Sequence, residues 1–289
     1  MSADKPRRPD TARPRAAPDF SGDVLAPTPQ ELLAIESERL RWVTLLGASV
    51  EPDEALGVTL ASHYAHGTGM NFAAAIRWPE SEVAMRLAEV ESRMRAAGTW
   101  PQLIVASGLT EPADLADQLL AAGWIRLGKE QIMYVRQPAV VPHLDPGLRI
   151  EAVTPATALE CARLETAAFG LDPNAVEESA SLLAAATESG AIRAFIVRLA
   201  REPIASARLV PGLPNSPVAS LHAIAVAARH RRRGYGRLVT TIATRAGLAT
   251  GHALVWLSVD EDNFGAIELY RTLGYDLALT WSRWAASVR

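Results

Sequence analysis

This chain of 289 residues contains one cysteine, few aromatic residues and no long apolar run. Its only cysteine, Cys161, can form neither an internal disulfide nor a cysteine-based zinc site, so a reducing compartment is expected. No apolar segment approaches the roughly 20 residues that span a bilayer, and no secretory signal pattern opens the sequence. We therefore expect a cytoplasmic protein with no membrane partner.

The chain also lacks a strong charge of one sign, since its formal net charge is −3. That balance argues against a protein that coats nucleic acid, and Tyr235 is the only stacking aromatic beside the basic run at 229–237. The Rossmann and P-loop glycine patterns are missing as well. Two histidines in His63-Tyr64-Ala65-His66 have no third ligand in view, so no metal is expected.

Enough apolar residues are present, 49% of the chain, to build two cores. Residues 1–22 are rich in proline and arginine and poor in apolar residues, which predicts a disordered tail. Three prolines and a glycine in 138–147 predict a linker. The domains expected on either side are 23–137 and 148–289.

Hydrophobic periodicity and turn residues predict alternating helices and strands in both domains. The expected helices are 29–46, 80–97, 114–122, 155–169, 173–188, 234–249 and 263–273. The expected strands are 72–78, 102–106, 125–136, 148–153, 191–198, 203–210, 218–226, 253–259 and 276–284. Strands mixed with helices indicate an α/β layered fold with mixed sheets flanked by helices.

The run RHRRRGYGRL at 229–238 places arginines where a helix begins, although the helix dipole carries about half a positive charge there. Gly234 and Gly236 let the backbone approach a ligand closely, and the unpaired amides of the first turn form a ready site for phosphate. A bound pyrophosphate would turn the repulsion of the arginines into attraction. The alternative is a turn whose arginines are simply solvated.

A second motif, NFGAIELYRTLGY at 263–275, follows the arginine and glycine turn. Together with the strand ending Ile224-Ala225-Val226 and the pattern R-x-x-G-x-G at 231–236, it resembles the GNAT superfamily of acetyl-CoA-dependent N-acetyltransferases. The resemblance covers about 148–289. It implies tandem GNAT-like domains if the first half shares the fold, with mostly antiparallel mixed sheets.

The resemblance implies which residues contact acetyl-CoA. The strand end would pair its backbone with the pantetheine arm, the turn would hold the pyrophosphate, and the start of the last helix would contact the pantetheine region. The residues carried over are Ile224, Ala225, Val226, Arg231, Arg232, Arg233, Gly234, Tyr235, Gly236, Arg237, Asn263 and Ala266.

Tyr270 matches the family's frequent general acid, although its helical spacing also fits a core aromatic. The strand before the turn has no carboxylate, and His222 is the candidate base there, with a structural histidine as the alternative. Alternation predicts that His222, Ile224 and Val226 point to one face. Glu165 or a chain of waters could replace the base, and Cys161 is expected to be a buried, inert thiol.

The first half ends in a Leu-x-x-x-Gly-Trp pattern at 119–124, similar to the end of a GNAT domain. It has no R-x-x-G-x-G turn after its strand, where Arg77-Trp78-Pro79-Glu80-Ser81 stands. We interpret it as a degenerate copy that packs on the second domain and shapes the acceptor pocket. An unrelated α/β domain of similar rhythm is the alternative.

The resulting hypothesis is an N-acetyltransferase that uses acetyl-CoA, in a ternary complex with direct attack, on a small-molecule amine or a protein amine. The alternative is a non-catalytic module that binds acyl-CoA or regulates a partner. The sequence identifies neither the acceptor substrate nor the oligomeric state, and it is compatible with a homodimer.

Overall fold

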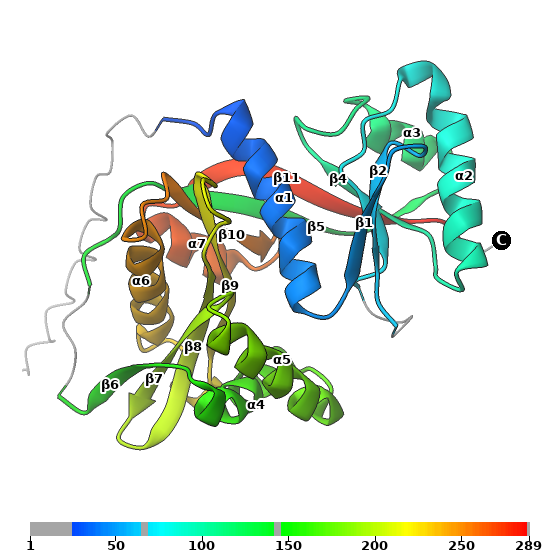
Figure 1. Ribbon diagram of the computed structural model, residues 1–289. Helices are drawn as coiled ribbons and strands as arrows, with labels where there is room; N and C mark the ends of the chain where they lie inside the picture. Colours follow the sequence, from blue (N-terminus) through cyan, green and yellow to red (C-terminus); the bar gives the residue numbers. More distant parts are fainter. Residues whose placement is uncertain (1–24, 65–68, 142–145, 288–289) are drawn as a thin grey trace, which may run out of the picture.

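The computed structural model describes residues 25–64, 69–141 and 146–287, so the predicted tail lies outside the described residues. One mixed sheet of 11 strands runs through both halves in the order β1-β2-β3-β4-β11-β5-β10-β9-β8-β7-β6. Helices flank it, with α2 and α3 at one end and α4, α5 and α6 at the other (Figure 1). The predicted α/β class is confirmed, but the separate sheets that we expected form one continuous sheet.

The first half follows the predicted alternation of helices and strands and adds the hairpin of β1 and β2, which the sequence pattern did not show. Its elements are α1 (Pro29–Leu45), β1 (Ser49–Asp53), β2 (Val58–Ser62), β3 (Phe72–Ala74), η1 (Glu80–Glu82), α2 (Val83–Ala96), β4 (Gln102–Ala106), α3 (Leu115–Ala121) and β5 (Ile125–Val135).

The second half agrees with the sequence prediction in every helix and strand, with small differences at the ends. Its elements are β6 (Leu148–Ala152), η2 (Pro155–Thr157), α4 (Ala158–Phe169), η3 (Pro173–Ala175), α5 (Val176–Glu188), β7 (Arg193–Leu199), β8 (Glu202–Val210), β9 (Val218–Val226), η4 (Ala228–His230), α6 (Tyr235–Leu248), β10 (Leu254–Asp260), α7 (Phe264–Thr272) and β11 (Asp276–Ala285).

The two halves exchange their last strands. β5 ends the first half but lies between β10 and β11, and it is antiparallel to both. β11 ends the second half but lies between β5 and β4, again antiparallel to both. Figure 1 shows these two long strands side by side through the middle of the molecule. Each half therefore completes the other's sheet, and each apolar core includes residues of the other half's last strand, Met133 and Val135 in one and Trp284 in the other.

Apolar clusters cover both faces of the sheet in the second half. Helices α4 and α5 pack on one face, against Ile196 and Val210. Helix α6 packs on the opposite face, against Ala207 and Leu209. Alternating strand residues supply both cores, because successive side chains point to opposite faces.

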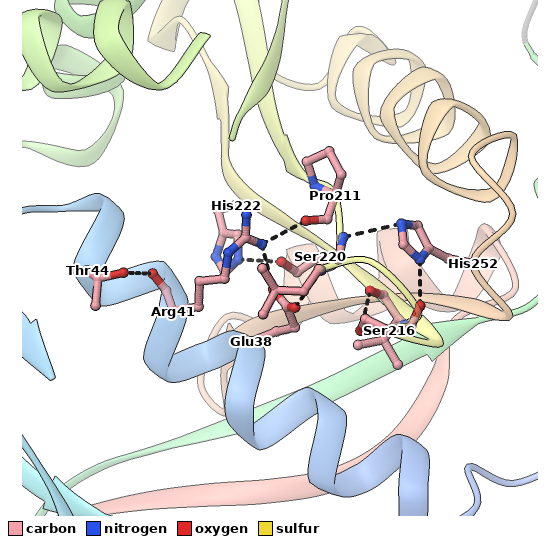
Figure 2. Close-up of polar contacts among 11 residues, drawn as sticks. Glu38, Arg41, Thr44, Pro211, Ser216, Ser220, His222 and His252 are labelled. Carbon is pink, nitrogen blue, oxygen red and sulfur yellow. Dashed lines mark hydrogen bonds and ion pairs between the residues drawn. The ribbon is translucent and has the colours of Figure 1, made fainter. Parts of the chain in front are cut away.

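Helix α1 belongs to the first half but also packs against the second. Thr28 and Glu31 form a capping box, and Pro29 stands in the first turn, so the helix begins where the sequence predicts. Glu31 also receives two hydrogen bonds of 2.8 Å from Arg136, the residue after β5. At the other end, Arg41 donates to the carbonyl oxygen of Pro211 at 2.7 Å, and Figure 2 shows this anchor.

The domain boundaries at 23–137 and 148–289 remain a prediction, and part of the expected linker, 142–145, lies outside the described residues. Within the described ranges, no helix combines the length and apolar character needed to cross a bilayer.

Candidate active site

Strands β9 and β10 start as parallel neighbours and then separate. Their pairing runs from Val218 with Leu254 to Leu221 with Leu257 and ends there. From His222 onward, the β9 edge that faces β10 has no ladder partner among the described residues, whereas its other edge stays paired with β8 as far as Val226. A strand edge with free amide and carbonyl groups is a template for an extended ligand.

A β-bulge lies at the point where the strands separate. Ala223 has a φ of 48°, and the pairing of β8 with β9 shifts between Ser206 and Arg208. The extra residue reverses the side-chain alternation after it. Ile224 and Val226 therefore pack on the α6 face, whereas His222 points to the α1 face and stacks on Trp42. The expectation that these three side chains share one face was wrong because a bulge interrupts the period of two.

The arginine and glycine turn leads from β9 into helix α6. Arg232 and Gly234 have φ values of 63° and 85°, and Gly234 is the N-cap, where no side chain caps the helix. The first turn of α6 thus offers amides without an intramolecular side-chain acceptor. Arg231 donates to the carbonyl oxygens of Val226 at 3.3 Å and Ala168 at 2.7 Å, which fixes the turn against the end of α4.

A groove of about 700 Å³ runs from the free edge of β9 to this turn. Eleven of the twelve predicted cofactor residues line it, and Arg233 is the exception. Tyr235 also packs into the core under α6, so its side chain supports the turn from below. Arg237 reaches Thr272 of α7 at 3.5 Å and closes the far wall. Uncapped amides and guanidinium groups around one cavity fit a diphosphate.

Asn263 and Ala266 form the third wall of the groove. The side chain of Asn263 accepts a hydrogen bond of 3.2 Å from the amide of Ala266 and caps α7. This bond explains the Asn-x-x-Ala spacing locally, because an N-cap side chain reaches the amide three residues later. The small side chain of Ala266 lies at the boundary with a second cavity, since it lines both.

Tyr270 lines this second cavity, and only 6% of its surface is exposed. Its hydroxyl has no hydrogen-bond partner within the described part of the chain. Burial raises the pKa of Tyr270 to about 12, so the phenol stays protonated at neutral pH. A protonated, unpaired hydroxyl beside the groove can donate a proton or a hydrogen bond to a group bound there.

His222 lines the same cavity but is held between aromatic rings. It stacks on Trp42 at 3.9 Å between ring centres, and its Nε2 lies 2.9 Å from the Ser220 hydroxyl (Figure 2). Burial lowers the pKa of His222 well below its ordinary value, and Arg39 and Arg208 add to this effect. The imidazole is therefore neutral at pH 7, and its assignment as the base remains a prediction.

Glu165 lies in neither cavity. It forms a buried ion pair with Arg208 and accepts hydrogen bonds from the Ser206 hydroxyl and the Cys161 thiol, both at 3.3 Å. Cys161 is buried, as predicted, and burial raises the pKa of its thiol. Neither residue reaches the groove as a base or nucleophile.

The second cavity has a volume of about 310 Å³ and draws its walls from both halves of the chain. Arg39 and Trp42 of α1, Glu130 of β5, Phe169 of α4 and Asp260 of β10 line it, and sequence reasoning named none of them. Only Asp260 carried a usable signal, as a carboxylate at the end of the strand that precedes the Asn263 motif. Strand exchange brings Glu130 into the site, the packing of α1 brings Arg39 and Trp42, and Phe169 reaches it from the end of α4.

Comparisons with known proteins agree with this geometry. Residues 160–275 match the family described as Acetyltransferase (GNAT) family. No curated protein matches the chain.

Solved structures resemble the chain over most of its length. A GCN5-related N-acetyltransferase from Kribbella flavida is 18% identical with a TM-score of 0.66, and the match covers 91% of this chain and 98% of that one. A tandem GNAT protein from the clavulanic acid biosynthesis pathway is 17% identical with a TM-score of 0.61, covering 79% and 78%. A GCN5-related N-acetyltransferase from Sphaerobacter thermophilus is 15% identical with a TM-score of 0.61, covering 91% and 95%.

At these identities the likeness to solved structures shows the fold, and the family match adds the motifs from α4 to the end of α7. Residues 160–275, in the C-terminal half of this chain, therefore carry the sequence pattern of the acetyltransferase (GNAT) family.

Proposed function

We propose that this protein is an N-acetyltransferase that transfers an acetyl group from acetyl-CoA to a primary amine. The observation that carries the proposal is the continuous path from the unpaired edge of β9 to the uncapped start of α6. An extended amide-containing chain suits the first part of the path, and a diphosphate suits the second.

The chain's own residues would hold acetyl-CoA in three places. The backbone of Ile224, Ala225 and Val226 pairs with the pantetheine amides. The first-turn amides of α6, with Arg232, bind the diphosphate. Asn263 and Ala266 leave room for the arm where the groove meets the second cavity.

The chemical step needs an amine held in line with the thioester and a proton for the departing sulfur. The second cavity opens beside the groove, which supports a ternary complex in which both substrates bind at once. Tyr270 donates the proton to sulfur, and backbone amides near the bulge stabilise the charge that develops on the thioester oxygen. Cys161 takes no part, because it is buried outside both cavities.

Titration with acetyl-CoA, followed by thiol release over a panel of primary amines, tests this function. At a concentration of about 100 times its dissociation constant, acetyl-CoA should stabilise the folded protein by roughly 2.7 kcal/mol. Calorimetry should give one site per chain. Binding without turnover of any amine would favour the non-catalytic acyl-CoA module, and no binding would reject the groove.

A further inference from the structure

The acceptor cavity, the second cavity described above, contains three formally charged side chains: Arg39, Glu130 and Asp260. Arg39 and Glu130 neutralise each other, because two guanidinium nitrogens donate to the two carboxylate oxygens at 3.1 and 3.3 Å. Arg39 also lies over the ring of Trp281 at 5.0 Å. The pair is thus fixed on α1 and β5, and the remaining formal charge in the lining is that of Asp260.

Asp260 ends β10 directly opposite Glu130 of β5 in the antiparallel ladder. Two like charges at paired positions of a ladder repel each other. Asp260 is an exposed residue, and its carboxylate forms no hydrogen bond or ion pair within the described residues, so only water and the charge of Arg39 offset this repulsion.

The surroundings of Asp260 make its carboxylate more basic than usual. Its pKa is raised by burial first and then by Glu130 on β5 and Asp262 in the loop before α7, whereas Arg39 on α1 acts in the opposite direction. A carboxylate in such surroundings gains from a cation beside it and accepts a proton more readily than an ordinary aspartate.

Tyr270 supplies an independent sign that a ligand belongs in this cavity. The residue is 6% exposed, its hydroxyl has no partner in the described chain, and its side chain lines the same cavity as Asp260. A hydroxyl in a cavity can donate a hydrogen bond to a ligand or to water. The cavity therefore combines one carboxylate and one hydroxyl donor, neither of which is bonded to another described residue.

We infer that the acceptor is a small primary amine that binds as its cation beside Asp260, and that Asp260 accepts its proton. This inference rests on the proposed acetyl transfer. His222 is the weaker base, because two aromatic rings and Ser220 confine it and because protonation would place a second charge near Arg39 and Arg208.

The step balances without another reactant. The ammonium nitrogen gives one proton to the Asp260 carboxylate, and its lone pair forms the new bond to the acetyl carbon. The carbon–sulfur bond breaks, and its electron pair leaves with sulfur, which takes a proton from Tyr270. A second proton is lost from nitrogen to water as the amide forms, and the amide nitrogen keeps the third. Tyr270 then regains a proton as Asp260 releases its own.

The walls favour a small acceptor over a protein chain. Trp42 and Arg39 of α1 close one side of a cavity of about 310 Å³, and α1 is anchored at both ends by its bonds to Arg136 and Pro211. The aromatic and aliphatic walls, Trp42, Phe169 and Ile224, suit an alkyl or aryl body behind the amine.

The test compares Asp260→Asn with Glu261→Gln, a neighbouring carboxylate that pairs with Arg126 and Lys129 and does not line the cavity. Probes are pentylamine and 5-aminopentanoate, which share a chain length and differ by a carboxylate. Wild type should prefer pentylamine by at least about tenfold in kcat/KM. Asp260→Asn should lower kcat/KM for pentylamine about 100-fold and reduce that preference, whereas Glu261→Gln should change neither.

A pH profile adds a readout that a purely structural role would not alter. In wild type, kcat/KM should fall as acid protonates Asp260, at a pH above the ordinary aspartate value of 3.8, and Asp260→Asn should lose this acidic limb. Equal activity of Asp260→Asn and Glu261→Gln, or an unchanged preference between the probes, would overturn the inference. Absence of turnover in wild type with both probes and with the amine panel would instead reject the proposed function.

Discussion

The two halves of the chain contain the same backbone feature, an alanine with a positive φ, but its surroundings differ between them. Ala75, directly after β3, and Ala223, within β9, have φ values of 52° and 48°. Each lies beyond the last parallel pair that its strand makes with the next strand, Ala73 with Leu103 and Leu221 with Leu257. Both halves therefore bend a strand away from its parallel neighbour at corresponding places.

In the first half, the protein itself fills the space that this bend creates. Glu111, beyond β4, donates its amide to the carbonyl oxygen of Ile76 at 3.1 Å and accepts from the amide of Trp78 at 3.0 Å. The indole of Trp78 then donates to Leu56 at 2.6 Å. In the second half, no such bond joins Ile224 or Val226 to the segment after β10 among the described residues. Backbone hydrogen bonds thus occupy this strand edge in the first half, whereas the corresponding edge in the second half is free among the described residues.

The segment that leads from the bent strand into the next helix also differs between the two halves. Before α2, the short turn η1 places Glu80 and Glu82, whose charges suit the positive end of a helix dipole. Before α6, Arg232 and Gly234 occupy that place, and their amides and charge suit an external anion. At the position of Tyr270 the first half has Leu119, fully buried in its core. A free edge, a basic rather than acidic turn before the helix and one hydroxyl thus distinguish the proposed site from its closed counterpart.

The largest effect is expected from removing that hydroxyl. Tyr270→Phe should lower kcat about 100-fold or more, because the departing sulfur loses its proton donor, and should leave the dissociation constant of acetyl-CoA unchanged. Single-turnover kinetics and calorimetry measure the two quantities. Leu119→Ala, at the corresponding place in the first half, should reduce stability by about 2–5 kcal/mol through a cavity. Unaltered kcat in Tyr270→Phe would remove this residue from the mechanism.

A smaller effect is expected from reversing charge at the arginine and glycine turn, the proposed diphosphate site. Arg232→Glu should weaken acetyl-CoA binding by roughly tenfold or more, since hydrogen bonds to charged groups contribute about 1.5–3 kcal/mol. The matched variant is Glu80→Gln with Glu82→Gln at the start of α2, which should leave acetyl-CoA affinity unchanged. Similar losses of affinity in both variants would contradict the assignment of one site to the second half.

The smallest effect concerns the contact that joins α1 to the end of β5. The Arg136 guanidinium lowers the pKa of Glu31 to about 2 from its ordinary value of 4.5. Because the folded-state pKa is depressed, this pair stabilises the protein above pH 4.5, and the contribution is lost as pH falls toward 2. Glu31→Gln should therefore cost about 1–2 kcal/mol at pH 7 and much less near pH 2. Urea denaturation at both pH values measures the difference, and an equal cost at both would show that capping alone matters.

The sequence by itself determined the local parts of the second half. Spacing within a short segment placed Gly234 at the start of α6, Asn263 at the start of α7 and Tyr270 on that helix, because turns and helix ends depend on residues a few positions apart. Composition and periodicity also gave the α/β class and most elements. The bulge at Ala223 was not predictable in this way, since alanine carries no preference for a positive φ.

Only the tertiary structure decided how the acceptor cavity is built. Glu130 meets Asp260 because β5 crosses into the second half and pairs with β10, and Arg39 and Trp42 arrive because α1 packs across the sheet. These contacts join residues 91 or more positions apart, and they depend on which strand edges pair. Which strands pair depends on the burial of whole sheet faces and on the pairing of exposed strand edges. No short segment of the sequence contains this information.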